Sequence, residues 1–298
     1  MPNAPLSRWI GIALLMIIAV IFGANHVGAR LAFDHGLTVT TAVAVRSAVT
    51  AVAVLALLMA FGAPLTLPRP TVGRALVIGA ILSVQSYCLY SAVARIPAAL
   101  ALLVFNVHPM VLTLLSWAAG GERPAPRALV AMPVALLGLA LALDLQGQSG
   151  SLSGRWTEIG AGVGYALVAA VSFATAMLFS ARWLQGVDGR LRSCLTMATV
   201  AVLAFASGAA SGTLALPADA SAWIGLALLT LFYGTAITSL FMLLPRLGAP
   251  SDIAALNFEP IAVLLVAWML LDQRLAPMQI AGALIVVAAI LAIGSGKR

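Results

Sequence analysis

Two stretches of the sequence decide the fold: LLVFNVHPMVLTLL at residues 102–115 and AALNFEPIAVLLVA at residues 254–267. Each belongs to an apolar run, and each carries Asn-x-x-Pro near its middle. Proline lacks a backbone N–H and crowds the carbonyl four residues before it, so Pro109 and Pro260 predict a kink in each run. An ionisable residue, His108 or Glu259, precedes each proline. The pattern predicts two kinked membrane helices with titratable groups at the kinks.

The rest of the composition also indicates a membrane protein. Of the 298 residues, 62% are hydrophobic and 8% are charged, whereas soluble domains have about 25% charged residues. A bilayer span needs about 20 mostly apolar residues, and inside lipid its backbone must be satisfied by helical hydrogen bonds. We therefore predict an all-α integral membrane protein with ten transmembrane helices. Their expected limits are 9–29, 38–61, 72–94, 98–118, 127–144, 158–180, 192–213, 221–244, 251–271 and 277–294.

The first apolar window also fits a signal peptide, because Arg8 precedes it. The comparable apolar segments that follow it favour a first helix that is retained.

The two halves of the chain form an internal repeat. An offset of 151 residues superimposes Asn106 on Asn257 and aligns several other scarce residue types without a gap. The aligned pairs are Arg95 with Arg246, Pro109 with Pro260, Trp117 with Trp268, Arg123 with Arg274 and Pro126 with Pro277. Each half, 1–148 and 149–298, then holds five helices. Because five is odd, the second half enters the membrane from the opposite side, which predicts the two inverted five-helix repeats common among secondary transporters.

Charge distribution indicates the orientation and argues against other partners. With the N-terminus inside, eleven of the 16 Lys and Arg residues lie on the cytoplasmic side, so both termini are expected to be cytoplasmic. The net charge of +7 does not predict nucleic-acid binding, because the basic residues are scattered between apolar segments. Cys88 and Cys194 lie in apolar stretches, and no Cys/His cluster has zinc-ligand spacing. No metal or cofactor is expected.

Polar residues near the kinks are the first candidates for a functional site. Asn106 and Asn257 add an amide beside each interrupted backbone. A charge at the centre of a membrane helix costs about 2.5–3.5 kcal/mol on insertion scales, so such groups normally face a polar cavity. An isolated Pro or Asn also serves as a packing kink or interhelical hydrogen bond. Two pseudo-symmetric copies, each beside a titratable residue, favour function.

Other polar residues of the spans are candidates for the same cavity. Arg46 lies within the second span, where its partner could be Glu259; the alternative is a side chain that snorkels to the interface. Tyr87, Tyr90 and Tyr233 are expected to offer aromatic contacts, although tyrosines also form interfacial belts. Asn25 and His26 lie towards the outer end of the first span.

The segments RIPAALALLVFNVHPMVLTLLSW (95–117) and RLGAPSDIAALNFEPIAVLLVAW (246–268) resemble the drug/metabolite transporter superfamily of the EamA type. Glu259-Pro260 is the most characteristic piece, and exporters of amino acids of the YddG type are a plausible close match. The resemblance implies a carrier of the bacterial inner membrane that moves small metabolites outward by alternating access. It also implies a central cavity lined by spans 1, 3, 4, 6, 8 and 9, with spans 5 and 10 outside. His108 departs from the pattern, because a carboxylate there would make the two halves chemically equal.

We therefore expect a secondary exporter of amino acids with aromatic or large apolar side chains. The expected solute-binding residues are Tyr87, Tyr90, Asn106, His108, Tyr233, Asn257 and Glu259, with Arg46 as a further cavity charge. A multidrug or other metabolite carrier of the same fold is the main alternative, and a receptor or scaffold is another. An enzyme is not expected, because the spans lack a nucleophile or metal set. The expected partners are a small solute and the lipid bilayer, and we expect the protein to be a monomer or homodimer.

Overall fold

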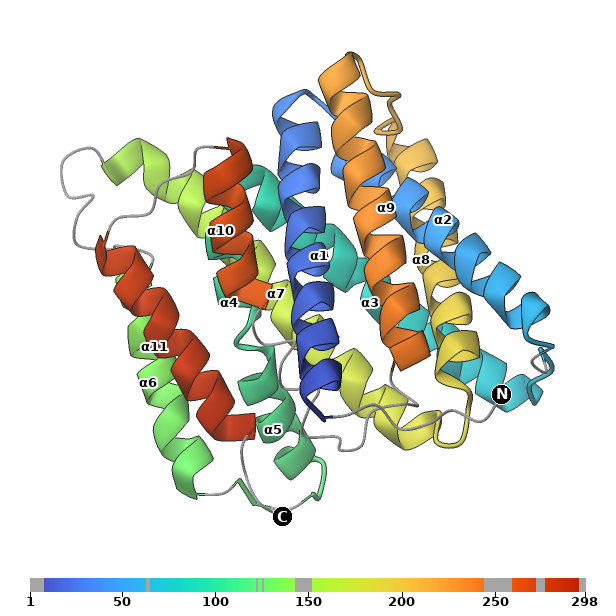
Figure 1. Ribbon diagram of the computed structural model, residues 1–298, viewed down its shortest axis with the longest axis horizontal. Coiled ribbons are helices and arrows are strands. Elements are labelled where there is room, and N and C mark those ends of the chain that lie inside the picture. The colour runs from blue at the N-terminus through green and yellow to red at the C-terminus, as the bar shows by residue number, and fades with distance from the viewer. Residues whose placement is uncertain are drawn as a thin grey trace.

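The computed structural model describes residues 8–62, 65–121, 123–124, 126–142, 152–243, 259–271 and 277–294 (Figure 1). These residues form helices and no strand. The helices of the first half are α1 (Arg8–Asp34), α2 (Val39–Ala60), α3 (Arg69–Arg95), α4 (Ala98–Phe105), α5 (His108–Ala118) and α6 (Pro126–Ala142). Those of the second half are α7 (Leu152–Trp183), α8 (Gly189–Ser211), α9 (Ala220–Leu243), α10 (Glu259–Leu271) and α11 (Pro277–Gly294).

The helices make up ten spans, because α4 and α5 are the two parts of one interrupted span, Ala98–Ala118. That span and the regions of α1, α2, α3, α7, α8 and α9 are long and apolar enough to cross a membrane. The three remaining helices, α6, α10 and α11, are shorter within the described residues. The prediction of an all-helical membrane protein is confirmed.

Helix packing has the two-fold pattern of an inverted repeat (Figure 1). The first helix of each half packs against the third helix of the other half, giving the pairs α1–α9 and α7–α3. The second helices pack against each other as α2–α8, and the fifth helices as α6–α11 at one edge of the molecule. If each helix is replaced by its counterpart in the other half, the same four helix pairs result. With five spans in each half, the halves are inverted relative to the membrane.

Small residues allow the closest of these approaches. A Cβ added to Gly225 of α9 would lie 2.5 Å from the backbone nitrogen of Ala32 of α1. Between α6 and α11, a Cβ added to Gly138 would lie 2.9 Å from the carbonyl oxygen of Gly282. Glycine therefore sets the distance between the paired helices, as is usual for helices that pack in lipid.

Several helices extend beyond the apolar windows expected from the sequence. The first window ends at residue 29, but α1 continues to Asp34. Arg30 pairs with Asp34 at 3.0 Å and donates to the carbonyls of Val93 and Ile96 at the end of α3. A charged last turn is thus stabilised by contacts that a search for apolar residues does not detect.

Candidate functional site

The kink of the fourth span lies at Asn106 and Val107, between the end of α4 and the start of α5. The side-chain amide of Asn106 donates to the Leu102 carbonyl at 2.8 Å. The Phe105 carbonyl, which Pro109 deprives of a helical donor, lies 3.2 Å from Nδ1 of His108. His108 therefore lies against the one carbonyl that Pro109 interrupts, whereas the Leu102 carbonyl keeps its helical donor, the Asn106 N–H, and accepts the Asn106 side chain as a second donor.

His108 packs among aromatic rings. Its imidazole lies 5.0 Å from the ring of Phe105 and 5.0 Å, edge to face, from the ring of Phe173 on α7. Contacts of this kind stabilise the position of a ring. The kink of the fourth span is thus held against α7.

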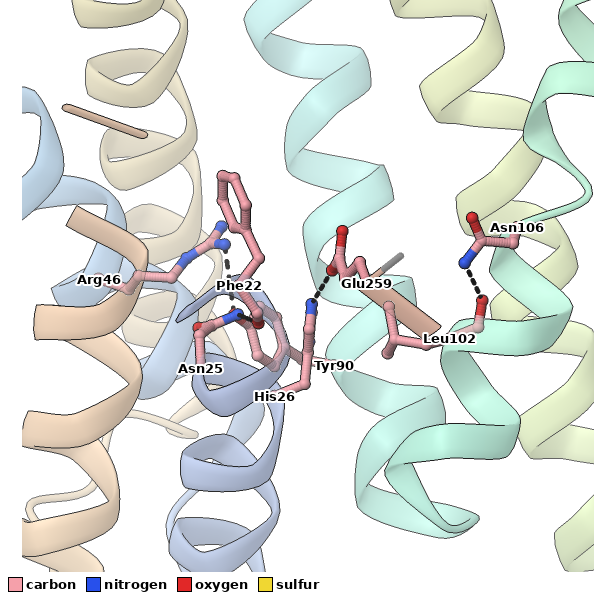
Figure 2. A network of polar contacts seen from close by, with 8 residues as sticks. All are labelled: Phe22, Asn25, His26, Arg46, Tyr90, Leu102, Asn106 and Glu259. Atoms are coloured by element: carbon pink, nitrogen blue, oxygen red, sulfur yellow. Dashed lines mark hydrogen bonds and ion pairs between the residues drawn. The ribbon is translucent and has the colours of Figure 1, made fainter. Parts of the chain in front are cut away.

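A group of buried polar side chains lies between α1, α2, α3 and α10 (Figure 2). We call it the polar network; its members are Asn25, His26, Arg46, Ser86, Tyr90 and Glu259.

Arg46 is the cation of this network. Only 4% of its surface is exposed, so its side chain does not snorkel. It donates to the hydroxyls of Tyr90 at 3.3 Å and Ser86 at 3.1 Å. Its guanidinium carbon lies 4.0 Å from the centre of the Tyr233 ring and 5.0 Å from that of Tyr90. Two aromatic faces and two hydroxyls thus hold the charge inside the protein.

Glu259, at the start of α10, is the anion of the network. Its Oε1 lies 3.4 Å from Nε2 of His26 on α1. The neighbouring Asn25 accepts a hydrogen bond of 2.9 Å from the Tyr90 hydroxyl, which in turn accepts from Arg46. Figure 2 shows Arg46 and Glu259 on opposite sides of His26 and Tyr90. The Arg46–Tyr90–Asn25 hydrogen bonds and the His26–Glu259 contact are thus two sets that meet at α1, where the His26 and Tyr90 rings lie 5.8 Å apart. Among the described residues the two charges do not form a pair.

Within the part of the chain that the structure describes, several buried side-chain atoms have no hydrogen-bond partner. They include Nε of Arg46, Nδ1 of His26 and the hydroxyls of Ser47 and Thr230. A buried polar group without a partner typically costs about 1–3 kcal/mol. The Nε–H of Arg46 therefore remains available to a polar ligand. With a free cationic donor at one end and a partly exposed carboxylate at the other, the network suits a solute that carries both charges.

One end of the neighbouring helices is closed by hydrogen bonds between loops. The hydroxyls of Thr38 and Thr40 donate to the Thr213 carbonyl at 2.7 and 3.1 Å. His35 lies 3.0 Å from the Asp219 carboxylate. The pKa of Asp219 is lowered, first by the Ala222 N–H and then by His35. These contacts tie the α1–α2 loop to the α8–α9 loop.

Both halves of the chain, residues 9–143 and 160–295, match the EamA-like transporter family. The chain belongs to the EamA-like transporter family. A solved structure titled "Crystal structure of protein" is similar over 96% of each chain, with a TM-score of 0.66 and 17% sequence identity, which supports the fold alone. A comparison with curated proteins gave no match. The resemblance to the EamA type is confirmed, whereas the closer match to amino-acid exporters of the YddG type stays a prediction. Members of the EamA-like family are transporters of small molecules, not enzymes.

In this EamA-like transporter the predicted site residues do not all lie together. Tyr90 and Tyr233 surround Arg46, and Glu259 is in the network. Asn106 lies apart on α4 (Figure 2), and Tyr87 is 44% exposed on the outer side of α3. Asn257 lies outside the described residues, as does the side chain of Pro260.

One expectation about the charges of this EamA-like transporter needs correction. The partners of Arg46 are the residues named above and not Glu259, which instead approaches His26. The network also includes Asn25, His26 and Ser86, which were not predicted to bind solute. A signal was present in the first span, where Asn25 and His26 interrupt an apolar helix. Both are buried, at 0% and 6% exposure.

Proposed function

We propose that this EamA-like transporter is a secondary transporter that exports amino acids with aromatic or large apolar side chains. It does so across the bacterial inner membrane by alternating access, with both termini in the cytoplasm. The observation that carries the proposal is the polar network, in which a buried arginine and a carboxylate lie on opposite sides of Asn25, His26 and Tyr90. An amino acid carries the complementary pair of charges.

In this proposal Arg46 binds the solute carboxylate. A guanidinium has five N–H donors in a planar fork that matches a carboxylate. Two hydroxyls occupy one donor on each terminal nitrogen, and Nε has no partner among the described residues. Arg46 is therefore held in place while part of its hydrogen-bonding capacity is free.

The apolar part of the solute lies against aromatic side chains in this proposal. The rings of Tyr233 and Phe22 meet edge to face at 5.9 Å, and the Tyr233 ring also faces the Arg46 guanidinium. A carboxylate on Arg46 therefore brings the solute side chain next to these two rings. Aromatic pairs of this geometry contribute about 0.5–1.5 kcal/mol beyond buried area.

Glu259 binds the solute ammonium in this proposal, or carries a proton in exchange for it. Its side chain is 26% exposed and has His26 beside it. A carboxylate and an imidazole at this distance can share a proton. Proton coupling and facilitated transport both remain compatible with this geometry, and a pH gradient distinguishes them.

Transport by the purified protein in liposomes tests the proposal. Liposomes are loaded with unlabelled L-phenylalanine, and uptake of labelled L-phenylalanine is measured with and without a pH gradient. We expect exchange that Arg46→Gln and Glu259→Gln each abolish. Dependence on the gradient supports proton coupling. Uptake of polyamines or cationic drugs in place of amino acids would instead favour a multidrug carrier, and absence of transport for every solute would favour a receptor or scaffold.

A further inference from the structure

A cavity of about 290 Å³ lies between α3, α7 and α8, and none of its lining residues belongs to the polar network. We call it the α3–α7–α8 cavity. Its lining residues are Ile78, Leu82, Phe173, Ala176, Met177, Ser180, Ala181, Arg192, Ser193 and Thr196. We propose that it binds a small organic carboxylate with an apolar body, independently of the solute assigned to the polar network.

The lining of the cavity is divided between apolar and polar groups. Ile78 and Leu82 of α3 and Phe173 of α7 form its apolar part. Ser180, near the end of α7, and Ser193, in the first turns of α8, contribute hydroxyls close to the α7–α8 connection. A ligand that fills the cavity therefore needs an apolar body and one polar end.

Arg192 determines the charge of that polar end. It is the charged residue in the lining, it is half-buried, and no partner for its guanidinium is found within the described part of the chain. The nearest acidic residue in sequence, Asp188, is already engaged, with its carboxylate 2.7 Å from Arg190. A half-buried guanidinium without an anionic partner favours an oxyanion, most strongly a carboxylate that accepts two parallel hydrogen bonds.

The size of the cavity limits the ligand. A volume of about 290 Å³ lies at the lower end of the range of about 300–1,000 Å³ that is typical of small-molecule pockets, so it suits a small solute. A phospholipid with two acyl chains is far larger. Phenylacetate, which has an aromatic ring and one carboxylate, has a suitable size and charge.

The repeat explains why a cavity exists here. Helices α3, α7 and α8 are the counterparts of α9, α1 and α2, which enclose Tyr233 and Arg46. At an offset of 151 residues, Leu82 occupies the position of Tyr233. Leucine is the smaller of the two, so this position leaves space in one half that an aromatic ring fills in the other. Phe173, which lines the cavity, also packs against His108 at the kink of the fourth span. A ligand in the cavity would therefore contact the aromatic ring that holds the kink.

Binding of phenylacetate to the purified full-length protein in detergent tests the proposal by calorimetry. We expect phenylacetate to bind and the uncharged 2-phenylethanol to bind at least about tenfold more weakly, because a hydrogen bond to a charged group is lost. Arg192→Gln should weaken phenylacetate binding by about tenfold or more. Arg95→Gln removes the same charge at the end of α3, outside the cavity lining, and should leave the affinity unchanged. Ala181→Trp, at an exposed lining position, should also reduce binding by obstructing the cavity.

Three outcomes would overturn the assignment. They are equal binding of the acid and the alcohol, equal effects of Arg192→Gln and Arg95→Gln, and loss of phenylacetate binding in Arg46→Gln but not in Arg192→Gln. The last would place the anion in the polar network. Because the measurement needs no transport, a failure here does not bear on the proposed export of amino acids. The reverse also holds, since Arg192 is not part of the polar network.

Discussion

Replacing Arg46 by glutamine should separate recognition of the solute carboxylate from folding. L-Phenylalanine and 2-phenylethylamine differ by the carboxylate alone. If Arg46 binds that group, Arg46→Gln should weaken the affinity for L-phenylalanine and leave the affinity for 2-phenylethylamine within about twofold. The selective loss follows because a hydrogen bond to a charged group contributes about 1.5–3 kcal/mol, and about 1.4 kcal/mol corresponds to tenfold in affinity. The expected loss for L-phenylalanine is therefore about 10- to 100-fold.

The structure also indicates that this substitution leaves the protein folded. Without the guanidinium, Ser86 still donates to Gln85 at 3.2 Å, and Tyr90 still donates to Asn25 at 2.9 Å. Neither hydroxyl loses all its partners. Removing the charge also relieves the burial cost of about 2.5–3.5 kcal/mol found on insertion scales, which offsets the lost contacts with the rings.

Affinities are measured by equilibrium binding to the purified protein, with thermal unfolding as the check on folding. Arg95→Gln is the matched control, because Arg95 also lies over a tyrosine ring, 4.7 Å from the centre of Tyr165, but does not contact the network. It should leave both affinities unchanged. Equal losses for the two ligands in Arg46→Gln would make Arg46 a structural residue. An unchanged affinity for L-phenylalanine would place the carboxylate elsewhere.

Three further substitutions test other parts of the structure. Glu259→Gln keeps the shape of the side chain but removes its charge, so binding of L-phenylalanine should fall at least about tenfold with little change in thermal unfolding; unchanged binding would make the residue structural. Asn106→Ala removes the buried hydrogen bond to the Leu102 carbonyl and should lower the free energy of unfolding by about 1 kcal/mol, measured by denaturation; no loss would show that this bond is not stabilising. Because the pKa of Asp219 is lowered in the folded protein, its contribution to stability is present above about pH 4 and is lost as the pH falls further. Melting temperatures measured from pH 3 to 6 should therefore depend less on pH in Asp219→Asn, and an identical profile would contradict a stabilising role of the Asp219 carboxylate, which accepts from the Ala222 N–H and contacts His35.

The spans and the repeat could be predicted because lipid imposes strong rules on sequence. A bilayer demands about 20 apolar residues per helix, and scarce residues such as Asn106 and Pro109 show the repeat when the chain is shifted onto itself. The predicted ends of the helices were less accurate than the predicted spans. The polar last turn of α1 is stabilised by the end of α3, a contact between distant parts of the chain.

The partners within the candidate site could not be predicted, because they depend on which helices meet. Opposite charge made Glu259 the natural partner for Arg46, but α2 packs against α8, α9 and α3, whereas α10 packs against α1. Glu259 therefore meets His26 of α1. Tyr87 and Tyr90 are three residues apart and only about 60° apart around the helix, yet one is exposed and the other is buried. The edge of the buried face of α3 therefore falls between them, and its position depends on which helices pack against α3.

Photolabelling with a diazirine analogue of L-phenylalanine tests the central claim most directly, because it reports where the solute binds. The analogue is bound to the purified protein and activated by light, and the labelled peptides are identified by mass spectrometry with excess L-phenylalanine as competitor. The account predicts competed labelling next to Phe22, Arg46, Tyr90 or Tyr233, which line or hold the cationic end of the network. Competed labelling confined to α6 and α11, or to the α3–α7–α8 cavity, would contradict it.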